Sequence, residues 1–108
     1  MGCDVGKQFD RKLGVWDLSL LQQELVYGFE YEMRDKASRL RYGQTLMTHA
    51  MLFTGVDVDE ATGETNKWRV ENSWGTENGD KGFHTMNDNW FEEHMFEIAA
   101  HPRYVMSC

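Results

Sequence analysis

A histidine and an asparagine are the residues of this chain whose types and spacing best suit chemistry. Residues 67–75 alternate polar and apolar side chains, so a strand here places Asn72 on the apolar face, between Val70 and Trp74. A buried amide must find hydrogen-bond partners, because an unpaired one destabilises the fold. The asparagine therefore predicts a polar neighbour across the strand.

His49 is the neighbour that the pattern predicts. A polar, glycine-containing loop at residues 57–66 separates two β-rich stretches, and residues that face each other in an antiparallel hairpin have a constant index sum. For a loop centred near Ala61 or Thr62 this sum lies near 122, and the numbers of His49 and Asn72 add up to 121. We expect the two side chains on adjacent strands.

An imidazole beside an amide suits proton transfer. The amide oxygen can accept one ring N–H, which fixes the tautomer and the ring plane and leaves the other nitrogen free to exchange a proton. Trp74 would form a wall of such a site. A lone histidine between Met47 and Met51 is more often a core residue. On spacing alone, a catalytic pair and a structural pair are both open interpretations.

Two early helices are predicted to help position the pair. Asp17 can cap a helix that Gly28 ends, and Asp35 can cap a second one that Gly43 ends. The apolar face of the first helix consists of Leu18, Leu21 and Leu25. We interpret both helices as packing elements without a role in the chemistry.

Most of the rest of the chain is predicted to form β-strands. Strands are predicted at residues 3–6, 45–56, 67–74, 83–86 and 95–101, with a loop at 7–14 and a helical turn at 87–94. No repeat or linker interrupts this order, so residues 1–108 are predicted to form one α+β domain.

Composition excludes several classes of function. The net charge of −7 argues against binding to nucleic acid or an anionic membrane surface, because both need a cationic face. No apolar run has the length of a membrane span and no signal peptide is recognisable, so a cytoplasmic protein is expected. The two cysteines, Cys3 and Cys108, predict reduced thiols, and no spacing suggests a metal site or a cofactor.

Several short motifs resemble one family of enzymes. "MTHAM" around His49, "VENSWG" around Asn72 and "GDKGF" follow the pattern of the papain superfamily. "GCDVGK", "LMTHAM", "KWRVENSWG" and "DNWF" are more closely similar to the C-terminal part of the bleomycin hydrolases, also called aminopeptidase C-type cysteine peptidases. These segments are spread over nearly the whole chain.

The resemblance implies a fold and an activity. The fold is a partial papain-like one, a barrel-like antiparallel β domain with one or two short helices on its N-terminal side. The implied chemistry is thiolate attack on a peptide bond, with His49 as general base and acid, Asn72 orienting it and Trp74 shielding their hydrogen bond. Implied partners are peptides with a free N-terminus and further copies of the enzyme, which is hexameric in the family.

The departures from the family pattern are equally informative. The helix that carries the nucleophilic cysteine and the glutamine of the oxyanion hole have no counterpart in this sequence. Cys3 lies in a predicted strand, without a helix N-terminus to activate it. We therefore expect the His/Asn part of a cysteine aminopeptidase, inactive alone. The alternative is a truncated, non-enzymatic module that binds a partner or a full-length subunit through its uncovered surface.

Overall fold

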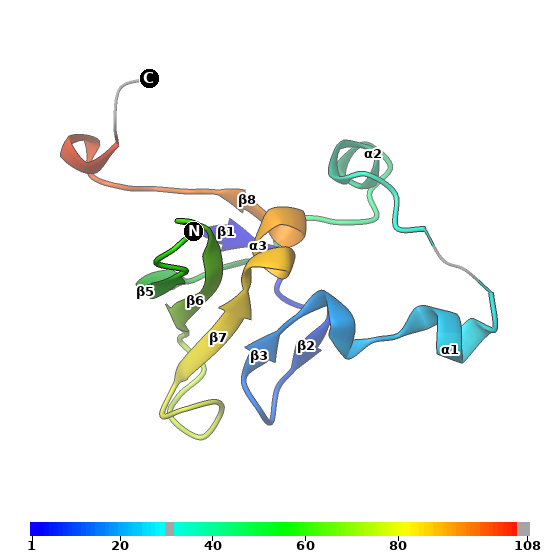
Figure 1. Cartoon of the computed structure of the whole chain (residues 1–108), viewed down its shortest axis with the longest axis horizontal. Helices are drawn as coiled ribbons and strands as arrows, with labels where there is room; N and C mark the ends of the chain where they lie inside the picture. Colours follow the sequence, from blue (N-terminus) through cyan, green and yellow to red (C-terminus); the bar gives the residue numbers. More distant parts are fainter. Residues whose placement is uncertain (30–31, 106–108) are drawn as a thin grey trace.

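The larger of two sheets is built around the predicted hairpin. In the computed structural model, which describes residues 1–29 and 32–105, this sheet has the strand order β2-β3-β7-β6-β5 (Figure 1). Its strands are β2 (Phe9–Asp10), β3 (Val15–Trp16), β5 (Leu52–Val58), β6 (Thr65–Glu71) and β7 (Phe83–Asn87). All neighbouring strands are antiparallel except β3 and β7, which are parallel.

The hairpin turn explains the register of the two long strands. The carboxylate of Asp59 accepts the N–H groups of Ala61 and Thr62 at 2.8 and 2.9 Å, so the loop is centred where the sequence predicts. Phe53 then faces Val70 across the pair. As the alternation predicts, the β6 side chains are exposed on one face, while Val70 on the other is fully buried.

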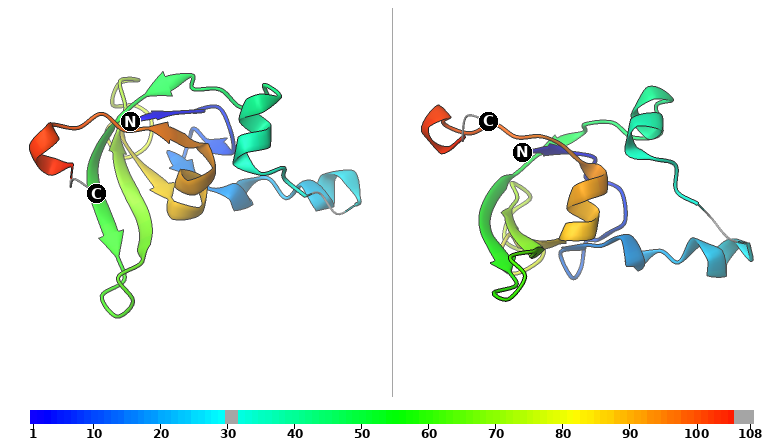
Figure 2. Two further views of the ribbon diagram at one scale, coloured as in Figure 1. Left: turned by 90° about the horizontal axis from the view of Figure 1, so that it is seen from above. Right: turned by 45° about the horizontal axis from the view of Figure 1, so that its top comes forward.

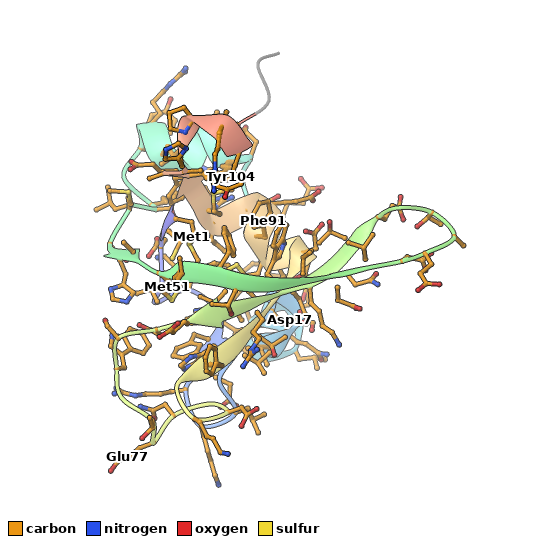
Figure 3. All side chains as sticks on the ribbon, turned by 90° about the vertical axis from the view of Figure 1, so that its left-hand side faces the viewer. Met1, Asp17, Met51, Glu77, Phe91 and Tyr104 are labelled. Atoms are coloured by element: carbon orange, nitrogen blue, oxygen red, sulfur yellow. The ribbon has the colours of Figure 1, made fainter. Side chains whose placement is uncertain are left out.

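A smaller sheet holds the start of the chain. Its strand order is β4-β1-β8, formed by β4 (His49–Ala50), β1 (Gly2–Cys3) and β8 (Met95–Glu97). The amino group of Met1 donates to the carbonyl of Met51 at 2.7 Å, and the N–H of Met51 donates to the carbonyl of Met1 at 3.0 Å. Figure 3 shows both residues at this edge of the molecule.

The predicted strand at residues 45–56 is wrong as one continuous element. This stretch forms β4 in the small sheet and then β5 in the large sheet. Met51, which is hydrogen-bonded to Met1, lies between the two strands. The closing strand is also shorter than predicted and ends at Glu97. The expected loop at residues 7–14 contains the two-residue strand β2.

A small aromatic core joins the sheets to α3 (Asp88–His94). Trp16 and Trp90 are fully buried, with ring centroids 5.8 Å apart. Each indole N–H donates to a main-chain carbonyl, that of Val5 at 2.9 Å and that of Lys7 at 2.7 Å, so burial leaves neither unpaired. The helical turn predicted at residues 87–94 is confirmed.

Residues 18–29 and 32–44 form an arm that stands away from the sheets (Figures 1 and 2). The arm contains η1 (Leu18–Leu20), α1 (Gln23–Tyr27) and α2 (Lys36–Arg41), and a last 3-10 turn, η2 (Pro102–Tyr104), lies near the C-terminus. The radius of gyration is 15.1 Å, above the value of about 13 Å typical of a compact domain of this length. The projecting arm and the segment that carries η2 both contribute to the excess (Figure 1).

The caps of the arm helices are confirmed, but one predicted helix is wrong. Asp17 and Asp35 accept N–H groups of the first turns, and Gly28 adopts the left-handed conformation at the end of α1. Extended backbone at Leu21 breaks the predicted helix into η1 and α1. Leu21 and Leu25 are 48% and 79% exposed, so this part of the predicted apolar face is not covered by any of the residues that the structure describes.

The α+β class is therefore confirmed, with one parallel strand pair inside an otherwise antiparallel arrangement. Among the described residues, no helix has the length and apolar character needed to cross a membrane.

Candidate active site

His49 and Asn72 are in direct contact. His49 Nε2 lies 2.9 Å from Asn72 Oδ1. Regular hairpin pairing ends one step earlier, at Leu52 and Glu71, and β4 instead pairs with β1, where His49 faces Cys3. The predicted adjacency is confirmed, although it arises from the crossing between sheets and not from facing positions in the hairpin.

Hydrogen bonds hold both the main chain and the side-chain oxygen of Asn72. Its side chain is buried, with 8% of the residue exposed, and its main-chain N–H donates to the carbonyl of Gly82 at 3.2 Å. The N–H of Ser73 donates to Asn72 Oδ1 at 2.8 Å. Two donors therefore converge on this oxygen, which assigns the orientation of the amide.

The tautomer of His49 follows from this geometry. An amide oxygen only accepts, so His49 Nε2 must carry the proton and Nδ1 has the free lone pair. Nδ1 is then the atom available to take a proton from another group. The buried Asn72 thus has the polar neighbour that the sequence predicts.

Trp74 covers the pair. Its ring stacks on His49 with centroids 5.1 Å apart and an angle of 27° between the planes. The ring of Phe9 lies 5.7 Å from that of Trp74 and supports it from β2. The stacking places the indole ring beside the imidazole that forms the hydrogen bond to Asn72.

Cys3 is unsuited to nucleophilic attack. It is fully buried, and burial raises the pKa of its thiol to about 12, so the reactive thiolate does not form at neutral pH. The second cysteine, Cys108, lies outside the described residues. Within residues 1–29 and 32–105, no three His, Cys, Asp or Glu side chains gather in a way that could hold a metal ion.

Sequence reasoning missed Arg11 as a neighbour of this site. Its guanidinium lies over the ring of Trp74, 5.6 Å from the centroid. The two residues are far apart in the chain, and nothing in the sequence around Arg11 distinguishes it from an ordinary turn arginine. Only the folded arrangement of the β2–β3 turn reveals the contact.

A hollow of the molecule lies away from this pair. It has a volume of about 540 Å³ and is bordered by the arm and by the buried residues Arg39 and His94. Neither His49, Asn72 nor Trp74 lines it. The candidate site and this hollow are therefore separate features of the molecule.

Comparison with known proteins now identifies the family. The model of the Peptidase C1-like family matches residues 1–107. This chain belongs to the Peptidase C1-like family. Its predicted resemblance to the bleomycin hydrolases and aminopeptidase C-type enzymes is confirmed.

Individual relatives extend this assignment. The Peptidase C1-like chain is 49% identical to human (Homo sapiens) bleomycin hydrolase over 105 residues and 40% identical to aminopeptidase C of Listeria monocytogenes over 104 residues. The crystal structure of PepW from Lactobacillus rhamnosis HN001 superposes with a TM-score of 0.79 at 44% identity, over 86% of this chain and 20% of that one. The partial papain-like fold is thereby confirmed.

The relatives are much longer than the aligned region. The alignments cover 96% of this chain but only 23% of human bleomycin hydrolase and of the Listeria enzyme. The Peptidase C1-like chain thus spans about a quarter of the length of these curated relatives.

Proposed function

We propose that this chain is the His/Asn-bearing part of a cysteine aminopeptidase of the bleomycin hydrolase type. The observation that carries the proposal is the hydrogen bond between His49 Nε2 and Asn72 Oδ1 beneath the ring of Trp74. It leaves Nδ1 free to exchange a proton, as a general base and acid requires. The family membership supplies the class of reaction.

In the proposed reaction, the nucleophilic cysteine comes from the remaining part of a longer protein. His49 Nδ1 takes the thiol proton, and the resulting thiolate attacks the scissile carbonyl carbon. As the carbon–nitrogen bond breaks, His49 returns the proton to the leaving amine. Water then attacks the thioester with His49 again as base, which releases the carboxylic acid and restores the thiol. Asn72 holds the ring plane through each transfer.

The isolated chain is proposed to be inactive. Cys3 is fully buried, and its pKa of about 12 keeps it protonated. No other cysteine occurs among the described residues. The amide nitrogen of Asn72 is also buried without a partner in this part of the chain, which suits a site completed by further protein.

The proposed substrates are peptides with a free N-terminus, and the complete enzyme is proposed to be a cytoplasmic homo-oligomer. These three statements rest on the family resemblance. They carry no weight in the argument for the pair of His49 and Asn72.

Complementation tests this proposal. The chain is mixed with a recombinant form of human bleomycin hydrolase that lacks the 105 matching residues, and release of aminomethylcoumarin from an aminoacyl substrate is followed. We expect turnover only when both parts are present. Co-purification of a stable complex without turnover would contradict the enzymatic proposal.

The same experiment addresses the second candidate, a non-enzymatic binding module. The exposed apolar residues of the arm favour it, among them Leu25 at 79% and Val26 at 64% exposure, because such surfaces mark sites of interaction. A module of this kind would capture a full-length subunit without restoring activity. Turnover that depends on the chain would exclude this candidate as its sole function.

A further inference from the structure

Trp74 connects the proposed active site to a cationic side chain. Its indole ring lies 5.1 Å from the ring of His49 and 5.6 Å from the guanidinium of Arg11. A positive charge is therefore held one aromatic ring away from the histidine. Cation–π contact with the indole restricts where this charge can lie.

The turn that carries Arg11 is ordered by its own hydrogen bonds. The N–H of Gly14 donates to the carbonyl of Asp10 at 2.8 Å, and the N–H of Leu13 donates to the Asp10 carboxylate at 2.9 Å. The acid beside Arg11 is thus engaged with the backbone. Figure 1 shows this β2–β3 turn at the same end of the molecule as the loop that follows Trp74.

Arg11 keeps its charge available. Across residues 1–29 and 32–105, the ion pair that forms joins Arg39 to Glu93. Arg11 is exposed and takes no part in an ion pair among these residues. The chain as a whole carries a net charge of −7. An unpaired guanidinium next to the proposed site is therefore a local exception in an acidic protein.

The proposed chemistry indicates which part of a substrate would lie near the Arg11 guanidinium. His49 must reach the leaving amine to protonate it, so the leaving group lies within hydrogen-bond distance of the ring. In the proposed complex, the residues that follow that amine extend past His49 towards Trp74, whose ring contacts both His49 and Arg11. A guanidinium at this place favours carboxylates, which it can bind through two parallel hydrogen bonds.

We propose that Arg11 is a specificity-determining residue that favours acidic leaving groups. The carboxylate is a Glu or Asp side chain, or a free C-terminus, within the first two residues after the scissile bond. This inference rests on the proposed function, because the position of the leaving group is deduced from the proton that His49 delivers to it. Because Arg11 is exposed, the expected preference is about three- to fivefold, and it weakens in 0.5 M salt.

The first test uses the chain as it is. Its Trp74 indole N–H signal is followed by NMR during titration with three peptides: glutamyl-glycinamide, glutaminyl-glycinamide and glutaminyl-glycine. We expect the first and third, which carry a carboxylate, to bind about three- to fivefold more tightly than the second. A preference for only one of the two acidic peptides tells whether the side chain or the C-terminus is the group bound.

Matched variants keep this test decisive. Arg11→Ala should abolish the preference, Arg11→Lys should retain part of it, and Lys12→Ala, on the same turn, should leave it unchanged. Equal affinities for the three peptides, a preference that survives Arg11→Ala, or no shift with any peptide would each overturn the inference.

A second test separates this inference from the proposed function. In the complemented enzyme, kcat/KM is compared for alanyl-glutamyl-glycinamide and alanyl-glutaminyl-glycinamide. We expect the acidic substrate to be favoured three- to fivefold, and the ratio to fall to one in Arg11→Ala. Hydrolysis of both substrates at equal rates overturns the role of Arg11 alone. Hydrolysis of neither contradicts the proposed function, while the peptide titration still decides whether Arg11 selects carboxylates.

Discussion

At the scale of single residues, the position of one oxygen atom organises the site. Asn72 Oδ1 receives donors from His49 and from the main chain of Ser73. The bond to His49 gains strength when the ring carries a positive charge, as it would after taking the thiol proton in the proposed reaction. The asparagine therefore contributes more to the charged state of the ring than to its resting state.

Substitution of Asn72 tests this contribution. Asn72→Ala in the complemented enzyme should lower kcat by about ten- to hundredfold, because a hydrogen bond to a charged group is lost. Steady-state kinetics with an aminoacyl substrate measure the change. Asn66→Ala, at an exposed asparagine of β6, should leave kcat unaltered. Equal kcat for Asn72→Ala and the unmodified enzyme would rule out an orienting role.

A second histidine, His94, makes the stability of the fold depend on pH. His94 is 3% exposed, and burial, followed by the positive charge of Arg39, lowers its pKa from 6.5 to about 4. Lys7 and Lys36 act in the same direction and Asp4 opposes them. Between these two pH values the unfolded chain binds a proton that the folded chain does not. The stability that neutral His94 contributes is therefore complete above pH 6.5 and is lost as the pH falls towards 4.

Urea unfolding at two pH values measures this loss. The free energy of unfolding should fall by about 2 kcal/mol between pH 7 and pH 5 on account of His94. His94→Gln should flatten the dependence, leaving the smaller part due to His84, whose pKa is also lowered by burial. His101→Gln, at an exposed histidine, should retain the full slope. A slope unchanged in His94→Gln would exclude this group as the cause.

The residues of the pair could be predicted from the sequence, but Arg11 could not. The alternation around Asn72 and the position of the hairpin loop restrict His49 to a narrow range of partners. Arg11 meets Trp74 only through a turn joining two strands of two residues each. Strands this short have no periodic pattern that would reveal them in a sequence.

At the scale of elements, the loop between β6 and β7 requires glycine at position 79. Gly79 has a φ of +64°, and a β-carbon there would overlap the carbonyl oxygen of Phe83. Gly63, in the β5–β6 turn, has a φ of +75° and open space around it. The two positions share the same backbone requirement and differ only in available room.

This contrast gives a matched pair of substitutions. Gly63→Ala should lower the free energy of unfolding by about 1 kcal/mol, the cost of a left-handed conformation. Gly79→Ala should cost about 1–3 kcal/mol more, because the backbone must also shift. Urea unfolding of both variants at pH 7 makes the comparison. Equal losses would show that the loop has room for a methyl group.

The arm is fastened to the body through α2. Arg39 is 5% exposed; it forms an ion pair with Glu93 and donates to the carbonyl of Glu93 at 3.0 Å. Lys36 adds a bond to the carbonyl of Glu92 at 2.8 Å. These contacts compensate for the missing apolar packing of the arm.

Removal of this fastening should loosen α2 without unfolding the sheets. Arg39→Ala is expected to speed amide exchange in residues 36–41 by about ten- to hundredfold, since charged hydrogen bonds are lost. Hydrogen–deuterium exchange followed by mass spectrometry reports on this segment. Arg41→Ala, at an exposed position of the same helix, serves as control. Unchanged protection of α2 in Arg39→Ala would contradict the anchoring role.

The arm also shows where sequence prediction fails. Helix caps depend on neighbouring residues, so Asp17, Gly28 and Asp35 could be recognised in advance. Whether Leu21 and Leu25 lie in one continuous helix depends on a surface to pack against, and no such surface covers them among the described residues. The periodicity of a segment predicts its apolar face but not the partner of that face.

At the scale of the whole molecule, the chain combines an ordered contact between His49 and Asn72 with exposed apolar surface. Trp74 stacks on His49, whereas apolar side chains such as Leu25 of the arm, at 79%, and Met47, at 54%, are exposed. The relatives are about four times as long as the aligned region. Both features agree with a part that acts within a larger protein.

The most direct measurement is the ratio of kcat/KM between the unmodified complemented enzyme and its His49→Gln variant. Loss of a general base and acid predicts a fall of about 10² to 10⁴-fold. His101→Gln should show none, and circular dichroism should show that both variants keep their fold. Activity retained in His49→Gln would contradict the account, because another group would then be moving the proton.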